Sequence, residues 1–150
     1  MALLREITLR YQFIQVDCDI TGNVIDSPHR IARIFSDLKY ETKEKFIVVT
    51  LNTRHEIMNY EVVAIGDVAS IQVRPIELFR TAIILNAPAI VAIHNHPSGS
   101  LEPSAADKCF TKRLARIGRD LDVRLLDHMI VSSKGHNSLR ETESKLFYPE

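Results

Sequence analysis

Two histidines at alternate positions end a short apolar run near the middle of the sequence. Residues 89–93 are entirely apolar and pass directly into His94-Asn95-His96, after which Pro97 interrupts regular structure. A short apolar run is typical of a strand buried on both faces, and alternate residues of a strand leave the same side of the backbone. We therefore expect both imidazoles to project from the end of a central strand into one site.

A carboxylate with matching chemistry follows at the start of the next predicted element. A helix is predicted over 104–118, with Ser104 at its start and Asp107 in its first turn. Two neutral imidazoles and one carboxylate, with a fourth position open, suit a catalytic zinc site. Ser-x-x-Asp at a helix start is also typical of a capping box, in which the serine caps and the acid reaches back to an amide. Both interpretations stay open, and they are compatible.

The remainder of the chain alternates β-rich and helical patterns. Strands are predicted over 7–16, 44–52, 57–65 and 123–131, and helices over 28–38, from 75 to a stop signal at 86–88, and over 140–147. The segments 44–52 and 57–65 indicate an antiparallel hairpin. Mixed strands and helices around one central sheet predict an α/β (α+β) sandwich. On the helix over 104–118, the side chains of Cys109, Phe110, Leu114 and Ile117 are expected to face the core.

Composition excludes several classes of protein. The 150 residues, 45% hydrophobic and 25% charged, fit one soluble globular domain. A formal net charge of zero gives no general attraction to nucleic acid, and the basic side chains within 112–119 are expected on the solvated face of a helix. We expect no membrane attachment, because no apolar run approaches the roughly 20 residues of a membrane span. The widely separated Cys18 and Cys109 indicate free thiols that serve packing in a reducing cytoplasm.

A hydrolytic metal centre also needs a carboxylate that takes a proton from the attacking water. Spacing alone does not select this group among four acidic candidates, Glu41, Glu44, Glu56 and Glu61. Asp127 and His128 lie inside the last predicted strand, where polar side chains are usually hydrogen-bonded. We expect these two residues to support the fold or a metal ligand rather than to bind metal directly.

Taken together, these residues resemble the JAMM (JAB/MPN) metalloprotease signature in its RadC-like bacterial form. The signature is carried by His-Asn-His-Pro-Ser-Gly at 94–99, by Pro103-Ser104 and by Asp107. Further similarity lies in Glu44-Lys45-Phe46, Leu51-Asn52, Gly66, Val73-Arg74-Pro75, Phe79, Ala82, Asn86-Ala87, Thr111, Leu114, Asp127-His128 and Ile130. The resemblance covers about 27–147. It predicts a RadC-like JAB/MPN domain over 27–150, with an N-terminal strand segment over 1–26 packed on it.

The resemblance implies both a fold and an activity. The fold would be a cytidine-deaminase-like three-layer sandwich with a central mixed sheet flanked by helices. His94, His96 and Asp107 would bind one Zn²⁺ per chain, with water as the fourth ligand. Glu44 would be the general acid/base, and Ser104 would steady the water or the oxyanion. The reaction would be hydrolysis of an amide bond in a peptide or protein, as in metallopeptidases and isopeptidases.

The chain also departs in three respects from the family that it resembles. We expect no N-terminal helix-hairpin-helix-like region of the kind found in longer RadC proteins, and 138–141 lacks their aromatic residue and glycine. The insertions with which eukaryotic members of that family bind ubiquitin are not evident in this sequence. The alternative function is that of a RadC-type accessory protein in DNA repair or recombination, acting as a binding module, although the net charge does not support DNA as a partner. A homo-oligomer is compatible with the sequence.

Overall fold

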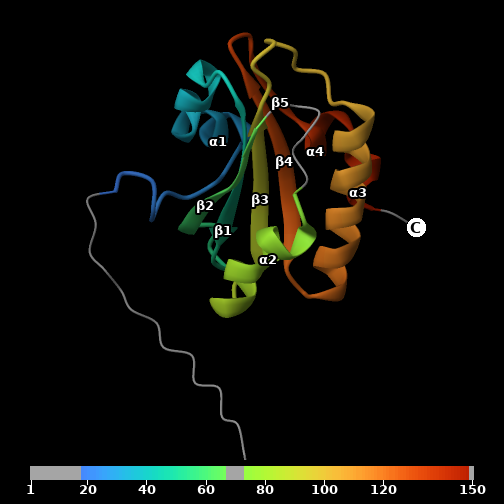
Figure 1. Cartoon of the computed structure of the whole chain (residues 1–150). Helices are drawn as coiled ribbons and strands as arrows, with labels where there is room; N and C mark the ends of the chain where they lie inside the picture. The colour runs from blue at the N-terminus through green and yellow to red at the C-terminus, as the bar shows by residue number, and fades with distance from the viewer. Residues whose placement is uncertain (1–17, 67–72, 149–150) are drawn as a thin grey trace, which may run out of the picture.

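A five-stranded mixed sheet forms the centre of the protein. The computed structural model describes residues 18–66 and 73–148, and Figure 1 shows the sheet with helices around it. The strands follow the order β2-β1-β3-β4-β5. Their bounds are Glu44–Leu51 (β1), Ile57–Gly66 (β2), Ala89–Asn95 (β3), Arg124–Ser132 (β4) and Gly135–Ser138 (β5). Strands β3 and β4 are parallel, and the other neighbours are antiparallel.

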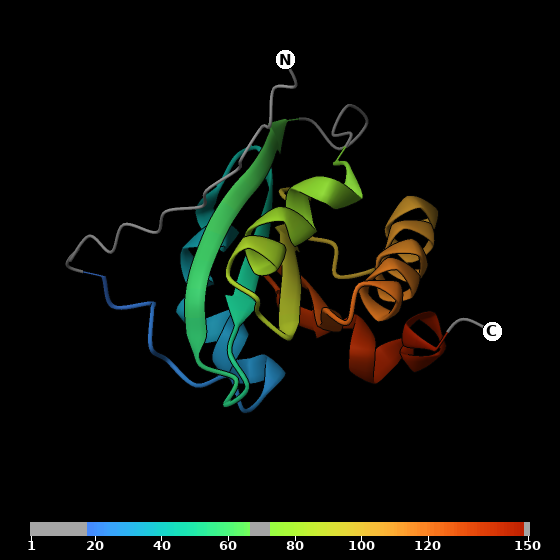
Figure 2. The same ribbon diagram turned by 90° about the horizontal axis from the view of Figure 1, so that it is seen from below.

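Helices cover both faces of this sheet. They are α1 (Pro28–Ile34), the 3₁₀ helix η1 (Ser36–Tyr40), α2 (Pro75–Ile84), α3 (Ala105–Asp120), α4 (Leu139–Thr142) and the 3₁₀ helix η2 (Ser144–Phe147). The first two pack on one face, and α2, α3, α4 and η2 pack on the other (Figure 2). The three-layer α+β sandwich expected from the sequence is therefore confirmed. No helix in the described part of the chain is long and apolar enough to cross a membrane.

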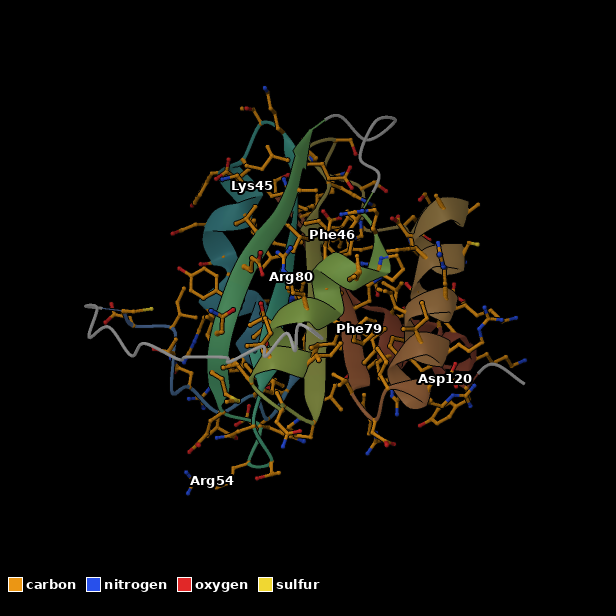
Figure 3. All side chains as sticks on the ribbon, turned by 60° about the horizontal axis from the view of Figure 1, so that its bottom comes forward. Lys45, Phe46, Arg54, Phe79, Arg80 and Asp120 are labelled. Carbon is orange, nitrogen blue, oxygen red and sulfur yellow. The ribbon has the colours of Figure 1, made fainter. Side chains whose placement is uncertain are left out.

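Strand alternation divides the core into two layers. In β1, Phe46 and Val48 face α2 and α3, whereas Ile47 and Val49 face α1. Figure 3 shows Phe46 from the sheet and Phe79 from α2, which both belong to the layer under α2 and α3. All residues of β3 are buried, because helices cover both sides of this central strand. The prediction of a doubly buried strand before the two histidines is confirmed.

Some predicted elements differ in detail. The hairpin of β1 and β2 is confirmed. The helix predicted over 28–38 is divided into α1 and η1, and the segment 140–147 holds two short helices. Strand β5 was not predicted from the sequence. The strand predicted over 7–16 lies outside the described residues, as does most of the segment predicted over 1–26.

The prediction that Cys109 packs into the core is wrong, because its side chain is exposed. The buried stripe of α3 consists of Thr111, Leu114, Ala115 and Gly118. A residue two positions from Thr111 lies about 200° away around the helix, on the solvent side. The basic side chains of 112–119 are exposed, as expected from the sequence.

The end of α3 fixes how the polypeptide enters β4. Asp122 has a left-handed backbone (φ 56°), and the N–H of Val123 donates to the carbonyl oxygen of Gly118 at 2.8 Å. This pattern is a common helix stop. A Cβ on Gly118 would lie 2.4 Å from the Val123 oxygen, so only glycine permits this close approach.

Candidate metal centre

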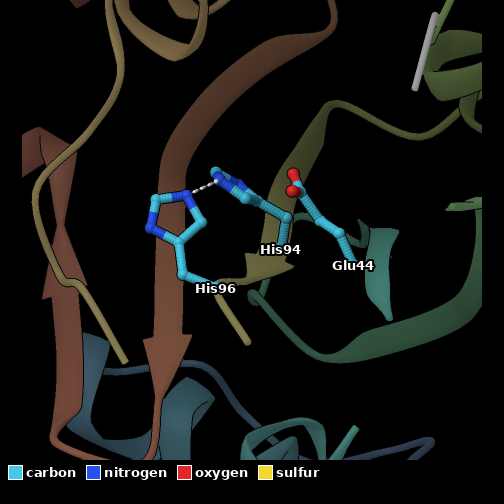
Figure 4. A group of neighbouring side chains, drawn as sticks. All are labelled: Glu44, His94 and His96. Carbon is cyan, nitrogen blue, oxygen red and sulfur yellow. Dashed lines mark hydrogen bonds between the residues drawn. The ribbon is translucent and has the colours of Figure 1, made fainter. Parts of the chain in front are cut away.

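The pairing of two strands brings the first candidate residues together. Phe46 of β1 is opposite His94 of β3, so the start of β1 lies beside the end of β3. Glu44 therefore neighbours both histidines, although about fifty positions separate them in sequence. Figure 4 shows the three side chains converging, and their ligand atoms all lie within 4.8 Å of one another. All three residues are buried.

Helix α3 adds a second carboxylate to this group. Asp107 Oδ1 lies 3.4 Å from His94 Nε2, and Asp107 Oδ2 lies 3.5 Å from His96 Nε2. The two Nε2 atoms are 3.0 Å apart (dashed line in Figure 4). Around a tetrahedral zinc ion with bonds of about 2.0–2.1 Å, neighbouring ligand atoms lie about 3.3 Å apart. The three side chains thus have nearly the spacing of three ligands of one such ion.

The helix cap fixes the position of the aspartate. Ser104 Oγ accepts a hydrogen bond from the Asp107 N–H at 3.0 Å, and Asp107 Oδ2 accepts one from the Ser104 N–H at 2.7 Å. This is the capping box anticipated from the sequence. The same carboxylate also faces both imidazoles, so the capping role leaves Asp107 in a position to bind a metal, and its role as a ligand stays a prediction. The Ser104 side chain lies beside the site, and its role toward water or an oxyanion stays a prediction.

Hydrogen bonding fixes the tautomer of His96. Its Nδ1 atom lies 3.1 Å from the carbonyl oxygen of Ser100, which can only accept. Nδ1 must therefore carry the proton. In the neutral ring, Nε2 then presents a lone pair to the site, as a metal ligand must.

A longer relay fixes the tautomer of His94. The Thr111 hydroxyl donates to the backbone carbonyl of Asp107 at 2.6 Å, so it accepts from His128 Nδ1, also at 2.6 Å. His128 Nε2 is then free to accept from His94 Nδ1 at 2.8 Å. Burial is the main cause that holds the pKa of His128 well below its ordinary value, so this ring is neutral. The Nε2 lone pair of His94 therefore also points into the site.

The site attracts a positive charge. The hydrogen bond with Asp107 raises the pKa of His96, although burial opposes this shift. Burial also acts to raise the pKa of Asp107. The hydrogen bonds of its carboxylate with His94 and His96 outweigh this effect and hold that pKa well below the ordinary range. Two lone pairs and a carboxylate directed at one point are stabilised by a cation there, whether a proton or a metal ion. The residues present therefore fit a divalent metal.

Glu44 supplies a free acceptor beside these ligand atoms. It is 7% exposed, and burial raises the pKa of its carboxyl group, whereas His94 and His96 lower it. Its Oε2 atom is buried without a hydrogen-bond partner. Such an orphaned acceptor costs about 1–3 kcal/mol unless a ligand or water satisfies it. Oε2 is therefore a buried, unpaired acceptor next to the two imidazoles, and the role of Glu44 as general acid/base stays a prediction.

The other acidic candidates are engaged elsewhere. Ion pairs join Glu41 to Lys45, Glu56 to Arg54, and Glu61 to Arg80. Among the four glutamates left open by the sequence, the geometry thus favours Glu44.

Asn95 holds Glu44 in place, a role that sequence reasoning missed. Its Oδ1 accepts from the N–H of Lys45 at 2.6 Å, and its Nδ2 donates to the carbonyl oxygen of Lys43 at 3.0 Å. These two groups flank Glu44 on either side. The available signal was an amide side chain in a strand that is otherwise apolar up to His94, since a buried amide needs partners.

Asp127 joins the end of the fold to the same region. Its Oδ1 accepts from the N–H groups of His128 and Arg140, and its Oδ2 accepts from Ser138 Oγ at 2.6 Å. The carboxylate thus links β4 to β5 and α4, next to the histidine that orients His94. Asp127 and His128 are hydrogen-bonded in the way expected of supporting residues.

The aspartate in the first turn of α3 faces two histidines at the end of the central strand β3. This arrangement is a candidate centre for one metal ion, built on a mixed sheet. The sequence profile of the RadC-like JAB domain matches residues 25–145, and the chain belongs to this family. The match confirms the resemblance noted from the sequence.

Relatives from several bacteria show the same family. The chain is 37% identical over 119 residues to a UPF0758 protein of Thermosynechococcus vestitus, covering 79% of this chain and 48% of that protein. It is 41% identical over 121 residues to a UPF0758 protein of Acidithiobacillus ferrooxidans (80% and 54%). It is 42% identical over 118 residues to one of Clostridioides difficile (78% and 50%). The chain thus spans about half the length of these curated relatives.

Proposed function

We propose that this domain is a JAMM-type metal-dependent hydrolase in which His94, His96 and Asp107 hold one zinc ion. One observation carries the proposal. Two independent hydrogen-bond arrangements leave the Nε2 lone pairs of both histidines facing each other and the Asp107 carboxylate. Without a cation this arrangement is unfavourable, and with one it is a three-ligand site.

The remaining groups support hydrolysis. A bound zinc ion would act as a Lewis acid and lower the pKa of a water molecule. The buried Oε2 of Glu44 would take the proton of the attacking water and return it to the leaving nitrogen. A raised carboxyl pKa suits a group that both takes and gives a proton. We infer that the bond is an amide, cleaved by peptidase or isopeptidase chemistry.

Metal content and turnover test this proposal separately. We expect about one zinc per purified chain, since three ligands with an open fourth position bind one ion, and none in His96→Ala. Zinc-loaded wild type should cleave members of a peptide library, and Glu44→Gln should keep zinc but lose cleavage. Glu41→Gln is the matched control, because Glu41 pairs with Lys45. Unchanged turnover in Glu44→Gln would remove Glu44 from the reaction, and a metal-free wild type grown with zinc would contradict the site.

A second candidate function, binding to DNA as an accessory module, draws on one surface feature. A depression of about 400 Å³ lies between α1, η1 and the β4–β5 turn. Its lining includes His29, Arg33, Lys39, Lys134 and His136, and no acidic residue among the described residues. This local charge suits phosphate groups even in a neutral protein. Affinity for duplex DNA should then fall steeply with salt and weaken in Lys134→Ala; undetectable binding at low salt would exclude this function.

A further inference from the structure

A cavity of about 690 Å³ opens directly on the candidate metal centre. Glu44, Ser104 and Asp107 form one end of it. Its walls are apolar and consist of Phe46, Val73, Pro75, Ile76, Phe110 and Ile117. Arg74, Ala106 and Arg113 complete the lining, so two of the lining residues are basic. A molecule in this cavity therefore meets apolar walls, basic side chains and the centre at once.

One face of α3 forms a wall of the cavity. Ala106, Phe110, Arg113 and Ile117 recur at intervals of four, three and four residues, which places them on one side of the helix. Phe110 packs edge-on against Phe46, with ring centroids 5.8 Å apart. On the α2 side, Ile76 is 62% exposed. Apolar surface gathered in a concavity next to reactive groups suits an apolar ligand group.

The charges of the cavity are unevenly distributed. Its acidic groups, Glu44 and Asp107, lie at the metal end. Arg74 lies 3.7 Å from Glu77, so this arginine already has an acidic partner. Arg113 takes part in none of the ion pairs of the described residues. A guanidinium group beside apolar walls binds a carboxylate well, because the fork of donors matches both oxygens.

The helix sets the spacing between the metal centre and this cation. Arg113 follows Asp107 by six residues, which corresponds to about 9 Å along the helix axis. An extended peptide advances about 3.3 Å per residue, so this length equals two to three residues of substrate.

We propose that the cavity binds an extended peptide that has a bulky apolar side chain next to the scissile amide and a carboxylate two or three residues from it, bound by Arg113. This substrate class rests on the proposed hydrolase function. The apolar side chain would lie against Phe110 and Ile76, and the carboxylate would pair with the arginine.

Binding to an inactive variant tests the inference apart from turnover. The probes are fluorescein-labelled ten-residue peptides of alanine and serine, with one leucine and one aspartate moved along the chain. Zinc-loaded Glu44→Gln should bind best when the two lie two or three residues apart. Replacing that aspartate by asparagine should weaken binding by about tenfold or more. Adding Arg113→Gln should abolish this difference. Adding Arg116→Gln should preserve it, since Arg116 is exposed on the same helix outside the cavity.

The outcomes separate the two proposals. Cleavage by wild type without any preference for the acidic peptides overturns the substrate class and leaves the hydrolase function standing. Arg113-dependent binding of acidic peptides without cleavage by wild type supports the binding site and overturns the hydrolase function. Equal binding of aspartate and asparagine peptides at every position overturns the inference.

Discussion

Thr111 is the most informative residue to change. It contacts neither imidazole of the proposed ligands, yet through His128 it sets the tautomer of His94. Its hydroxyl donates to the backbone carbonyl of Asp107 and accepts from His128 Nδ1. Thr111→Val keeps the shape of the buried side chain and removes the acceptor. His128 must then leave its Nδ1 proton unpaired or move the proton to Nε2, where it would confront the proton on His94 Nδ1.

The magnitude follows from either response. A buried N–H without an acceptor costs about 1–3 kcal/mol. If the protons shift instead, His94 carries its proton on Nε2, the atom that faces His96 and Asp107, and this proton must be displaced before a metal binds. Removing such a supporting partner typically weakens metal affinity by about 10- to 100-fold. We expect a loss in this range for Thr111→Val.

A chelator competition at neutral pH measures the effect. Thr111→Ser is the matched control, because it retains the hydroxyl and should keep wild-type zinc affinity. Melting of both metal-free variants separates a general loss of stability from a change at the site. Equal zinc affinities of the valine and serine variants would refute the relay, since the hydroxyl would then have no influence on His94.

Three further predictions concern stability and positioning. In metal-free protein, the raised pKa of Glu44 contributes stability that is present at low pH and is lost as pH rises above 4.5, and the raised pKa of His96 contributes stability that is lost as pH rises above 6.5. The lowered pKa of His128 has the opposite sign, so its contribution grows as pH rises toward 6.5. The effect of Glu44 is therefore measured as a difference: the melting temperature of metal-free wild type relative to that of Glu44→Gln should fall between about pH 5 and pH 8; a difference that stays constant or rises with pH would contradict the shift assigned to Glu44. Asn95→Ala should keep zinc but slow peptide cleavage by about tenfold or more, because the backbone on either side of Glu44 loses its hydrogen bonds to the Asn95 side chain; full turnover would show that these hydrogen bonds are not needed to position Glu44. Gly118→Ala should lower the free energy of unfolding by about 1–3 kcal/mol in denaturant titration, and an unchanged midpoint would mean that the Val123 carbonyl moves aside freely.

The local features of this protein follow from short sequence patterns. The hairpin, the helix starts at Pro28 and Pro75 and the doubly buried strand before His94 all follow from patterns within a few residues. The alternation of His94 and His96 and the capping box of Asp107 are equally local. Such features depend on backbone periodicity and on nearest hydrogen-bond partners, which neighbouring residues specify.

Which distant side chains meet depends on strand pairing and helix packing. The register between β1 and β3 places Glu44, rather than another glutamate, beside the histidines. The packing of α3 on β4 brings Thr111 to His128 and thereby orients His94. Cys109 is exposed because the rotation of α3 against the sheet turns it outward. These outcomes depend on strand pairing and helix packing between segments far apart in the chain, and no local pattern encodes that geometry.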